Sequence, residues 1–314
     1  MTPLTERTYR LHDLHLRTNL PLGLLPLGDA PADVVVSYVE APEPGARPST
    51  DFSTTWRSTP DGGTLTYQGS TGDRLDFFLN QTAARVDVRC SLPGHTETVA
   101  RIFLGPGMAA LLTLRGAVVL HGGAVVVDGR AILVLGNSGA GKSTFVAAMV
   151  AAGAPFITEE VAALVESVEG FEILPGYPRI GLSGASLAAV GMHANRPLVM
   201  PASAEGKRWL DVCELKGGAH GLSRPVGAIY VLGDRVNGNE PSITRLRGST
   251  AVPMVLQHLY GARWLAIDHG RCLRAIAAVA GSVPIFSLAV PAGLDRIGAH
   301  AAAVLTHAHA HIAR

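Results

Sequence analysis

The stretch that most constrains this chain is LVLGNSGAGKSTFVAAM, residues 133–149, in which glycines interrupt two strongly apolar segments. The segment before the glycines, 131–135, is apolar at every position, as expected of a strand buried on both faces of a sheet. The segment after them, 143–152, is rich in alanine and favours a helix that ends near Gly153. The sequence therefore predicts an α/β domain in which a glycine-rich loop joins a buried strand to a helix.

The loop matches the pattern GxxxxGK[ST] in the context that the pattern requires, a strand before it and a helix after it. Glycines let successive backbone N–H groups point inward, and the start of the helix adds a positive dipole end. Lys142 would reach the β- and γ-phosphates, and the Ser143 hydroxyl would ligate Mg²⁺. A chance glycine turn is the alternative. We expect ATP with Mg²⁺ to bind at Gly136, Asn137, Ser138, Gly139, Ala140, Gly141, Lys142, Ser143 and Thr144.

An acidic pair, Glu159 and Glu160, follows an apolar run in APFITEEVAAL, which we interpret as one strand. In a parallel sheet the end of this strand would lie on the same edge as the glycine loop. Adjacent side chains on a strand point to opposite sides, so one acid could face Mg²⁺ and the other an incoming hydroxyl. We assign Glu159 to the metal with Ser143, and Glu160 as the general base. Two solvated surface glutamates are the alternative.

The rest of the chain suggests two domains, at 1–100 and 101–314. The first contains short strand-like runs separated by Gly, Asp or Pro, which predicts a β-rich accessory domain. In the second, Asp128-Gly129 between two β-branched runs predicts a hairpin. Further segments are predicted as a helix at 108–114, strands at 224–234 and 242–248, helices near 251–261 and 268–280, and a terminal helix within 294–313.

The composition argues against some classes of binding partner. A net charge of +1 gives no electrostatic footprint for nucleic acid or an anionic membrane. No apolar run approaches the roughly 20 residues of a membrane helix, and the start lacks the apolar region of a signal peptide. The three cysteines are scattered and do not indicate a disulfide framework. We therefore expect a cytoplasmic protein.

The segment LHGGAVVVDGRAILVLGNSGAGKSTFVAAMVAAGAPFITEEVAAL resembles the catalytic core of the HPr kinase/phosphorylase superfamily. In that family a histidine-glycine pair precedes a hairpin, a GxSGxGKS loop and an acidic pair. Two further stretches, LPGYPRIGL at 174–182 and GKRWLD at 206–211, resemble a branch found with lasso peptide biosynthesis genes. Members of that branch are reported to phosphorylate a serine on a precursor peptide. The resemblance is strong over 117–182, and residues 5–115 resemble the branch's short β-rich N-terminal region.

The resemblance implies a P-loop kinase domain of the HPr kinase C-terminal type. It places His121 near the transferred phosphate and the glycine loop around the nucleotide. Glu159 and Glu160 fall where the family usually has Asp-Asp, which is a departure. The phosphorylase motif of the bifunctional enzymes is not found, so kinase activity alone is implied. Related enzymes form hexamers, which suggests a homo-oligomer.

Three further cations are candidates for stabilising charge on the γ-phosphate, namely Arg179, Lys207 and Arg208. Arg179 completes a predicted catalytic set with Glu160, His121 and Lys142, whereas Lys207 and Arg208 follow Gly206 in a predicted loop. Ordinary surface cations are the alternative for all three.

These observations predict an ATP·Mg²⁺-dependent kinase that transfers the γ-phosphoryl group to a hydroxyl, such as a serine of a lasso precursor peptide. A kinase for a small hydroxylated metabolite and a catalytically degenerate ATP-binding regulatory module remain alternatives. The expected partner is a peptide or small-molecule acceptor, with no nucleic acid and no membrane.

Overall fold

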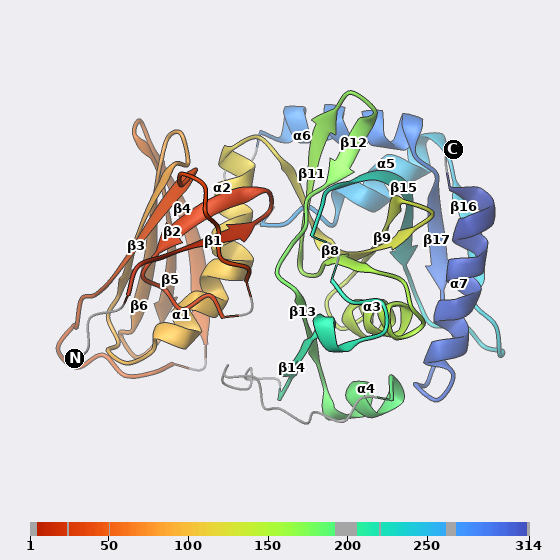
Figure 1. The fold of residues 1–314 in the computed structure, drawn as a ribbon, viewed down its shortest axis with the longest axis horizontal. Helices are drawn as coiled ribbons and strands as arrows, with labels where there is room; N and C mark the ends of the chain where they lie inside the picture. Colours follow the sequence, from red (N-terminus) through yellow and green to blue (C-terminus); the bar gives the residue numbers. More distant parts are fainter. Residues whose placement is uncertain are drawn as a thin grey trace. The chain divides into compact units, whose positions relative to one another are not determined.

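The computed structural model describes residues 5–23, 25–49, 51–191, 206–219, 221–261 and 268–312. Contacts divide the chain into two compact units (Figure 1). The first contains the chain up to Ala117, and the second contains the described residues from Val118 to Tyr260 and from Asp268 onward.

The described part of the first unit forms a seven-stranded sheet in the order β1-β2-β3-β7-β6-β5-β4. The β-rich character expected from the sequence is confirmed. Its pairs are antiparallel except for β2–β3 and β3–β7, which are parallel. The strands are β1 (Arg7–Leu11), β2 (Leu14–Thr18), β3 (Val34–Glu40), β4 (Phe52–Thr59), β5 (Gly62–Gly69), β6 (Arg74–Asn80) and β7 (Arg85–Cys90).

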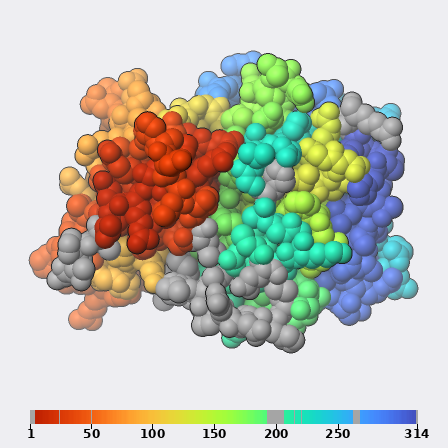
Figure 2. Space-filling model, in the orientation of Figure 1, coloured from red at the N-terminus to blue at the C-terminus, as the bar shows by residue number. Residues whose placement is uncertain are grey.

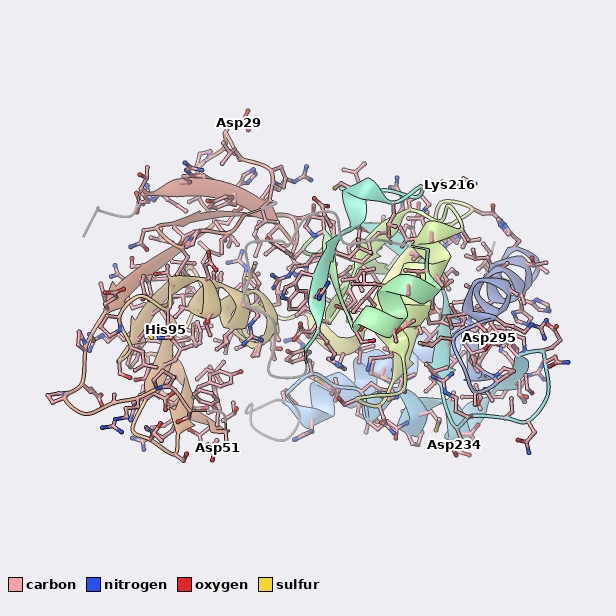
Figure 3. All side chains as sticks on the ribbon, turned by 90° about the horizontal axis from the view of Figure 1, so that it is seen from below. Asp29, Asp51, His95, Lys216, Asp234 and Asp295 are labelled. Carbon is pink, nitrogen blue, oxygen red and sulfur yellow. The ribbon has the colours of Figure 1, made fainter. Side chains whose placement is uncertain are left out.

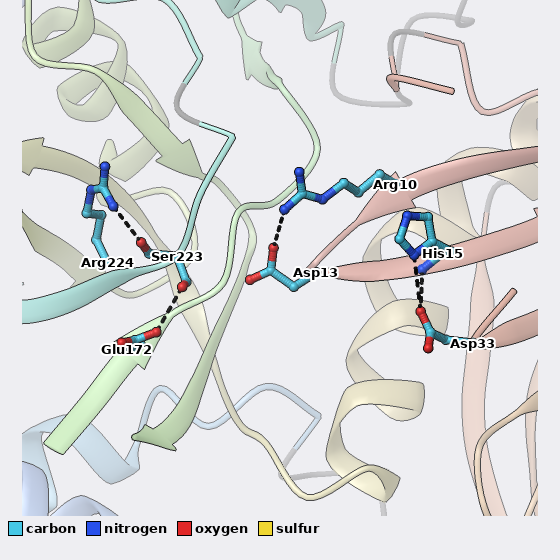
Figure 4. Close-up of polar contacts among 7 residues, drawn as sticks. All are labelled: Arg10, Asp13, His15, Asp33, Glu172, Ser223 and Arg224. Carbon is cyan, nitrogen blue, oxygen red and sulfur yellow. Dashed lines mark hydrogen bonds and ion pairs between the residues drawn. The ribbon is translucent and has the colours of Figure 1, made fainter. Parts of the chain in front are cut away.

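Two polar contacts lie beside strands β1 and β2 of this sheet (Figure 4). Arg10 and Asp13 form an ion pair across the β1–β2 turn, with 3.1 Å between Nη2 and Oδ1. The Asp33 carboxylate accepts a hydrogen bond of 2.8 Å from the backbone N–H of His15. The second contact ties the segment leading into β3 to the start of β2.

One continuous helical stretch, Thr96–Leu114, carries the apolar face that covers the sheet. It consists of α1 (Thr96–Ile102), a π-helical segment η1 (Phe103–Gly107) and α2 (Met108–Leu114). Phe103 stacks on Phe77 of β6 with 6.3 Å between ring centroids. By length and composition this stretch could cross a membrane, so the expectation that no apolar run comes near that length was wrong. Inside the protein, 61% of its apolar window is buried.

The second unit is built on a mixed sheet, which has eight strands among the described residues. Its path is β10-β8-β11-β12-β15-β17-β16, and β9 pairs with β8 and β15. The strands are β8 (Val118–Val127), β9 (Arg130–Gly136), β10 (Phe156–Thr158), β11 (Val161–Ser167), β12 (Gly170–Ile173), β15 (Arg224–Leu232), β16 (Ser242–Leu246) and β17 (Ile285–Ala289). A separate pair is formed by β13 (Arg179–Leu182) and β14 (Arg208–Asp211).

Strand β9 is a central strand of this sheet. It pairs antiparallel with β8 and parallel with β15. The predicted hairpin is confirmed: Asp128 and Gly129 have φ values of 48° and 76°, as a two-residue type I′ turn requires. Residues 131–135 are buried at every position, as predicted for a strand covered on both faces.

The helices of the second unit include α3, which leads away from the glycine loop and packs against α7. They are α3 (Lys142–Ala151), α4 (Gly184–Ala189), α5 (Ala251–Leu256), α6 (His269–Ser282) and α7 (Ile297–His311), with short 3₁₀ turns η2 (Val212–Glu214) and η3 (Gly248–Thr250). Figure 2 shows α7, in dark blue, at the surface of the unit.

Two predicted elements were wrong in detail. The single strand expected across the acidic pair is divided into β10 and β11, with Glu159 and Glu160 at a corner between them. Both strands pair with β8 antiparallel, so the sheet is not parallel on this side. The helix expected near 251–261 ends at Leu256, because the chain turns back to the sheet and Tyr260 N–H donates to Val119 O.

Candidate functional site

The glycine loop, residues 137–141, runs from the end of β9 to the start of α3. Gly141 has φ 93°, a left-handed conformation that favours glycine, and it caps α3. A Cβ at Gly136 would lie 3.0 Å from the Leu232 carbonyl, so glycine lets β9 and β15 approach at the mouth of the loop. The loop thus has backbone conformations and clearances that depend on glycine.

Lys142 is only 7% exposed, and its Nζ donates to the Asn137 carbonyl at 3.0 Å. Its ammonium group therefore lies back across the loop that it follows in sequence. Burial lowers the pKa of Lys142, and Lys207 adds to this effect. The nearby carboxylates of Glu159 and Glu160 act in the opposite direction.

Ser143, the second residue of α3, donates its hydroxyl to the Glu159 carboxylate, with 2.6 Å between Oγ and Oε1. The two side chains that we assigned to the metal therefore meet. Burial and the neighbouring Glu160 charge raise the pKa of Glu159 to about 7, and the Ser143 hydrogen bond and the two lysines oppose that rise. Because this pKa lies near neutral pH, a cation that binds beside Glu159 would change its protonation at neutral pH.

A tight turn separates the two acids. Val161 N–H donates to the Glu159 carbonyl at 3.0 Å, and Glu160 between them has φ 71°. This is the positive-φ form of the γ-turn, which is rare and strained for a residue with a side chain. The Thr158 hydroxyl braces it by donating to the Val161 carbonyl at 2.7 Å. We predicted that strand alternation would separate the acids, whereas the strained turn does so.

The corner nevertheless lies at the predicted edge of the sheet. Strands β9 and β10 are both antiparallel to β8, so they run in the same direction. Their carboxyl ends therefore meet at one edge, where Gly136 leads into the glycine loop and Thr158 leads into the acidic corner.

His121 lies on β8 directly opposite Val161, beside the corner. Its ring packs at 5.5 Å, centroid to centroid, against the ring of Tyr260. Burial and the charges of Lys142 and Lys207 lower the pKa of His121, while Glu160 acts to raise it. The imidazole is therefore neutral at neutral pH.

The remaining predicted cations occupy different environments. The Arg179 guanidinium is buried, 3.9 Å from the Trp209 ring and 4.5 Å from the Tyr177 ring, distances typical of cation–π contacts. Lys207 is half-buried, and its charge acts on His121, Lys142 and Glu159. Arg208 is exposed and begins strand β14, so its prediction as a loop residue was wrong.

Thr144 was predicted within the phosphate-binding set, and its hydroxyl lies 2.8 Å from the Ser186 hydroxyl of α4. This contact ties the first turn of α3 to α4. The remaining loop residues Asn137, Ser138 and Gly139 are exposed.

Sequence reasoning missed two residues at this edge. Tyr260 donates to the Glu160 carboxylate at 2.9 Å, although it is far away in sequence and belongs to no motif. Arg235 donates to the Ala140 carbonyl of the loop at 3.0 Å. Arg235 follows β15, a buried strand that is parallel to β9. Its position just beyond a buried strand is a sequence pattern from which it could have been predicted.

The residues present fit a nucleotide with Mg²⁺. The glycine-dependent turn is exposed at Asn137, Ser138 and Gly139, just before the N-terminus of α3, where backbone N–H groups can bind phosphate. Mg²⁺ prefers hard oxygen ligands and binds through one or two carboxylates together with phosphate oxygens and water. Ser143 and Glu159 supply that chemistry. Over the residues that the structure describes, no group of three or more His, Cys, Asp or Glu side chains is placed to hold a metal ion by itself.

Comparison with solved structures finds several chains that match this one. The HPr(Ser) kinase/phosphatase from Coxiella burnetii is similar to this chain. The match covers 60% of this chain and 95% of that protein, with 13% sequence identity and a TM-score of 0.35. No protein-family model and no curated protein matches the sequence.

Proposed function

We propose that this protein is an ATP·Mg²⁺-dependent kinase that transfers the γ-phosphoryl group to a hydroxyl. The observation that carries the proposal is the contact between Ser143 and Glu159, at the start of the helix that follows the glycine loop. It unites the loop with an acidic residue at the position where a Mg²⁺ ligand is needed. The same corner turns a second carboxylate, Glu160, in another direction.

Each residue then has a role in the proposal. Lys142 and the backbone N–H groups of the loop bind the phosphates, and Ser143 with Glu159 would hold Mg²⁺. When bound, the ion neutralises negative charge on the phosphates. Glu160 takes the proton of the acceptor hydroxyl as the new O–P bond forms and the bond between the β–γ bridging oxygen and Pγ breaks, which releases ADP.

The flanking residues support these roles. Neutral His121 lines the acceptor side beside Glu160 and adds no positive charge there. Lys207 is the second cation of the proposal, because its charge already acts on Lys142 and Glu159. The role of Arg179 at the γ-phosphate stays a prediction.

For the acceptor, we propose a serine of a peptide or protein. The resemblance of 174–182 and 206–211 to kinases of lasso precursor peptides favours this acceptor class. A β-rich accessory domain followed by a kinase domain remains part of the proposal, although contacts divide the chain after Ala117 and not at the predicted boundary near residue 100. A neighbouring gene for a short precursor with a C-terminal serine would support the peptide acceptor, and its absence would favour a small metabolite.

The test is phosphoryl transfer from γ-labelled ATP with Mg²⁺. A mixture of serine-containing peptides, the same peptides with alanine at each serine, and a set of small hydroxylated metabolites serve as acceptors. Label on serine peptides alone is the expected result. Lys142→Ala should abolish it, whereas Lys216→Ala, at an exposed lysine labelled in Figure 3, should not.

Two results would contradict the proposal in different ways. Mg²⁺-dependent ATP binding without transfer to any acceptor would favour the regulatory module with a degenerate site. No ATP binding at all would remove the kinase proposal altogether.

A further inference from the structure

The Glu160 carboxylate does not stand alone at the acidic corner. The Tyr260 hydroxyl donates to Glu160 Oε1 at 2.9 Å. The tyrosine is 9% exposed, and its ring packs against the ring of His121. One side chain therefore contacts both residues that the proposed kinase uses on its acceptor side.

The backbone around Tyr260 is fixed to the same strand as His121. His121 N–H donates to the His258 carbonyl at 2.7 Å, and Tyr260 N–H donates to the Val119 carbonyl at 2.8 Å. Between these bonds, Leu259 forms an isolated antiparallel bridge with Leu120. The segment 258–260 is thus added to the edge of β8, and its backbone bonds hold Tyr260 beside the strand that carries His121.

Glu160 has a particular need for such a contact. Its backbone adopts a strained γ-turn, and this conformation has an energetic cost that the turn itself does not offset. A glutamate side chain also has several rotamers, and a base must lie within hydrogen-bond reach of the proton that it takes. A donor on a rigid segment selects one carboxylate position.

The neighbouring histidines do not offer an equivalent charged donor. Burial lowers the pKa of His121, and burial together with the charge of Lys142 lowers the pKa of His258 to about 4. Both imidazoles are neutral at neutral pH. The Tyr260 hydroxyl is then the donor on this side of the corner for which the structure shows a direct bond to Glu160.

We propose that Tyr260 is a positioning residue that holds the Glu160 carboxylate beside His121 for proton transfer from the acceptor hydroxyl. This proposal rests on the proposed kinase function. It goes beyond that function because it gives a role on the acceptor side to the segment 258–260, which follows α5. Tyr260 acts through Glu160 and does not itself take the proton.

The kinetic test compares Tyr260→Phe with Tyr230→Phe, measuring ADP formation from Mg·ATP with the serine-peptide mixture. Tyr260→Phe keeps the ring and removes the hydroxyl. We expect kcat to fall by about 10- to 100-fold, because misplacement of a reacting group by about 1 Å can cost that much. The KM for ATP should change less than about twofold, since the phosphate loop keeps its contacts.

Tyr230→Phe is the matched control. Tyr230 lies buried on β15 in the same unit, and its hydroxyl is bonded to His307 at 2.8 Å. The two substitutions remove the same group from a buried tyrosine, and Tyr230→Phe should leave kcat unchanged. The proposal would be overturned if kcat were unchanged in both variants while both lost the same thermal stability.

A second measurement needs no nucleotide. Denaturant midpoints of the protein without ATP are compared for Tyr260→Phe, Glu160→Ala and the double variant. Non-additive shifts are expected, because each single change removes the same hydrogen bond. Additive shifts would contradict the contact. If the wild type forms no ADP, the kinase proposal fails, and this cycle still decides whether Tyr260 holds Glu160.

Discussion

The two sides of the proposed kinase site, one that we propose binds phosphate and one that we propose binds the acceptor, are built in different ways. On the phosphate side, the glycine loop and the start of α3 come from one continuous stretch, 136–144, whose shape depends on glycine and on the helix N-terminus. On the acceptor side, His121, the corner at Glu159–Glu160 and Tyr260 come from three separate segments. Only the sheet brings these segments together. A local motif is therefore sufficient to recognise the first side, whereas the second depends on tertiary structure.

This contrast predicts that the two sides can be disabled separately. The largest effect is expected on the acceptor side, where Glu160→Gln should leave ATP affinity nearly unchanged and lower phosphoryl transfer by about 10²- to 10⁴-fold, the range for general acid–base catalysis. Calorimetry and label transfer measure the two quantities. Glu166→Gln, at an exposed position on β11, is the control. Wild-type transfer in Glu160→Gln would remove Glu160 from the role of base.

The reciprocal change is on the phosphate side. Lys142→Ala removes the ammonium group that lies over the loop, and we expect ATP affinity to fall on the order of 100-fold through loss of charge-assisted hydrogen bonds. The Tyr260–Glu160 contact should survive, because it shares no atom with the loop. Titration of ATP with and without Mg²⁺ checks the affinity. Undiminished binding in Lys142→Ala would mean that the loop is not the phosphate site.

The boundary between the two sides is Glu159, and its pKa of about 7 makes that boundary sensitive to pH. In the proposed site Mg²⁺ would bind the ionised carboxylate of Glu159, so protons would compete with it. The Mg²⁺-dependent part of ATP affinity should therefore fall up to about tenfold per pH unit below 7. Glu159→Gln supplies the baseline, since titration of the nucleotide itself is common to both proteins. Identical pH profiles for the two would exclude Glu159 as the metal ligand.

The same raised pKa predicts the sign of a stability change. Between the ordinary value of 4.5 and about 7, the folded protein holds a proton on Glu159 that the unfolded chain releases. The contribution of Glu159 to the free energy of unfolding therefore falls as pH rises through this window. Denaturant unfolding should show that Glu159→Gln gains stability relative to the wild type between pH 5 and pH 7.

The smallest effect concerns the strained turn that sets the acceptor side apart. Glycine adopts the φ of 71° at position 160 without steric cost, whereas alanine does not. Since both variants lack the carboxylate, Glu160→Gly should be more stable than Glu160→Ala by roughly 1 kcal/mol. Urea unfolding measures the difference. A more stable alanine variant would show that the turn relaxes when the carboxylate is removed.

The sequence predicted the elements whose signals are local. The Asp128-Gly129 turn, the buried strand at 131–135 and the helix that ends before Gly153 follow from turn chemistry, apolar runs and glycine. The β-rich region at the start of the chain followed from its short runs between turn residues. The meeting of Ser143 with Glu159 agrees with the spacing of motif and acidic pair.

The parts that could not be predicted depend on long-range pairing. A γ-turn at Glu160 has no signature in an apolar run that continues on both sides of it. Tyr260 lies in a segment that forms backbone hydrogen bonds with β8, and these bonds end the preceding helix early. Helix propensity contains no information about such long-range bonds. The β13–β14 pair joins residues separated by a long connection, so no local pattern links Arg179 to Trp209.

The position of β9 between β8 and β15 also sets an order of assembly. The hairpin with β8 closes over two residues and can form as soon as it leaves the ribosome, while β15 is synthesised much later. Until β15 arrives, the nascent chain has the whole GNSGAGKS motif but lacks the strand that backs Gly136 and leads to Arg235. A fragment cut before residue 224 would keep the signature and lose the support, so the proposed nucleotide site would be completed only late in translation.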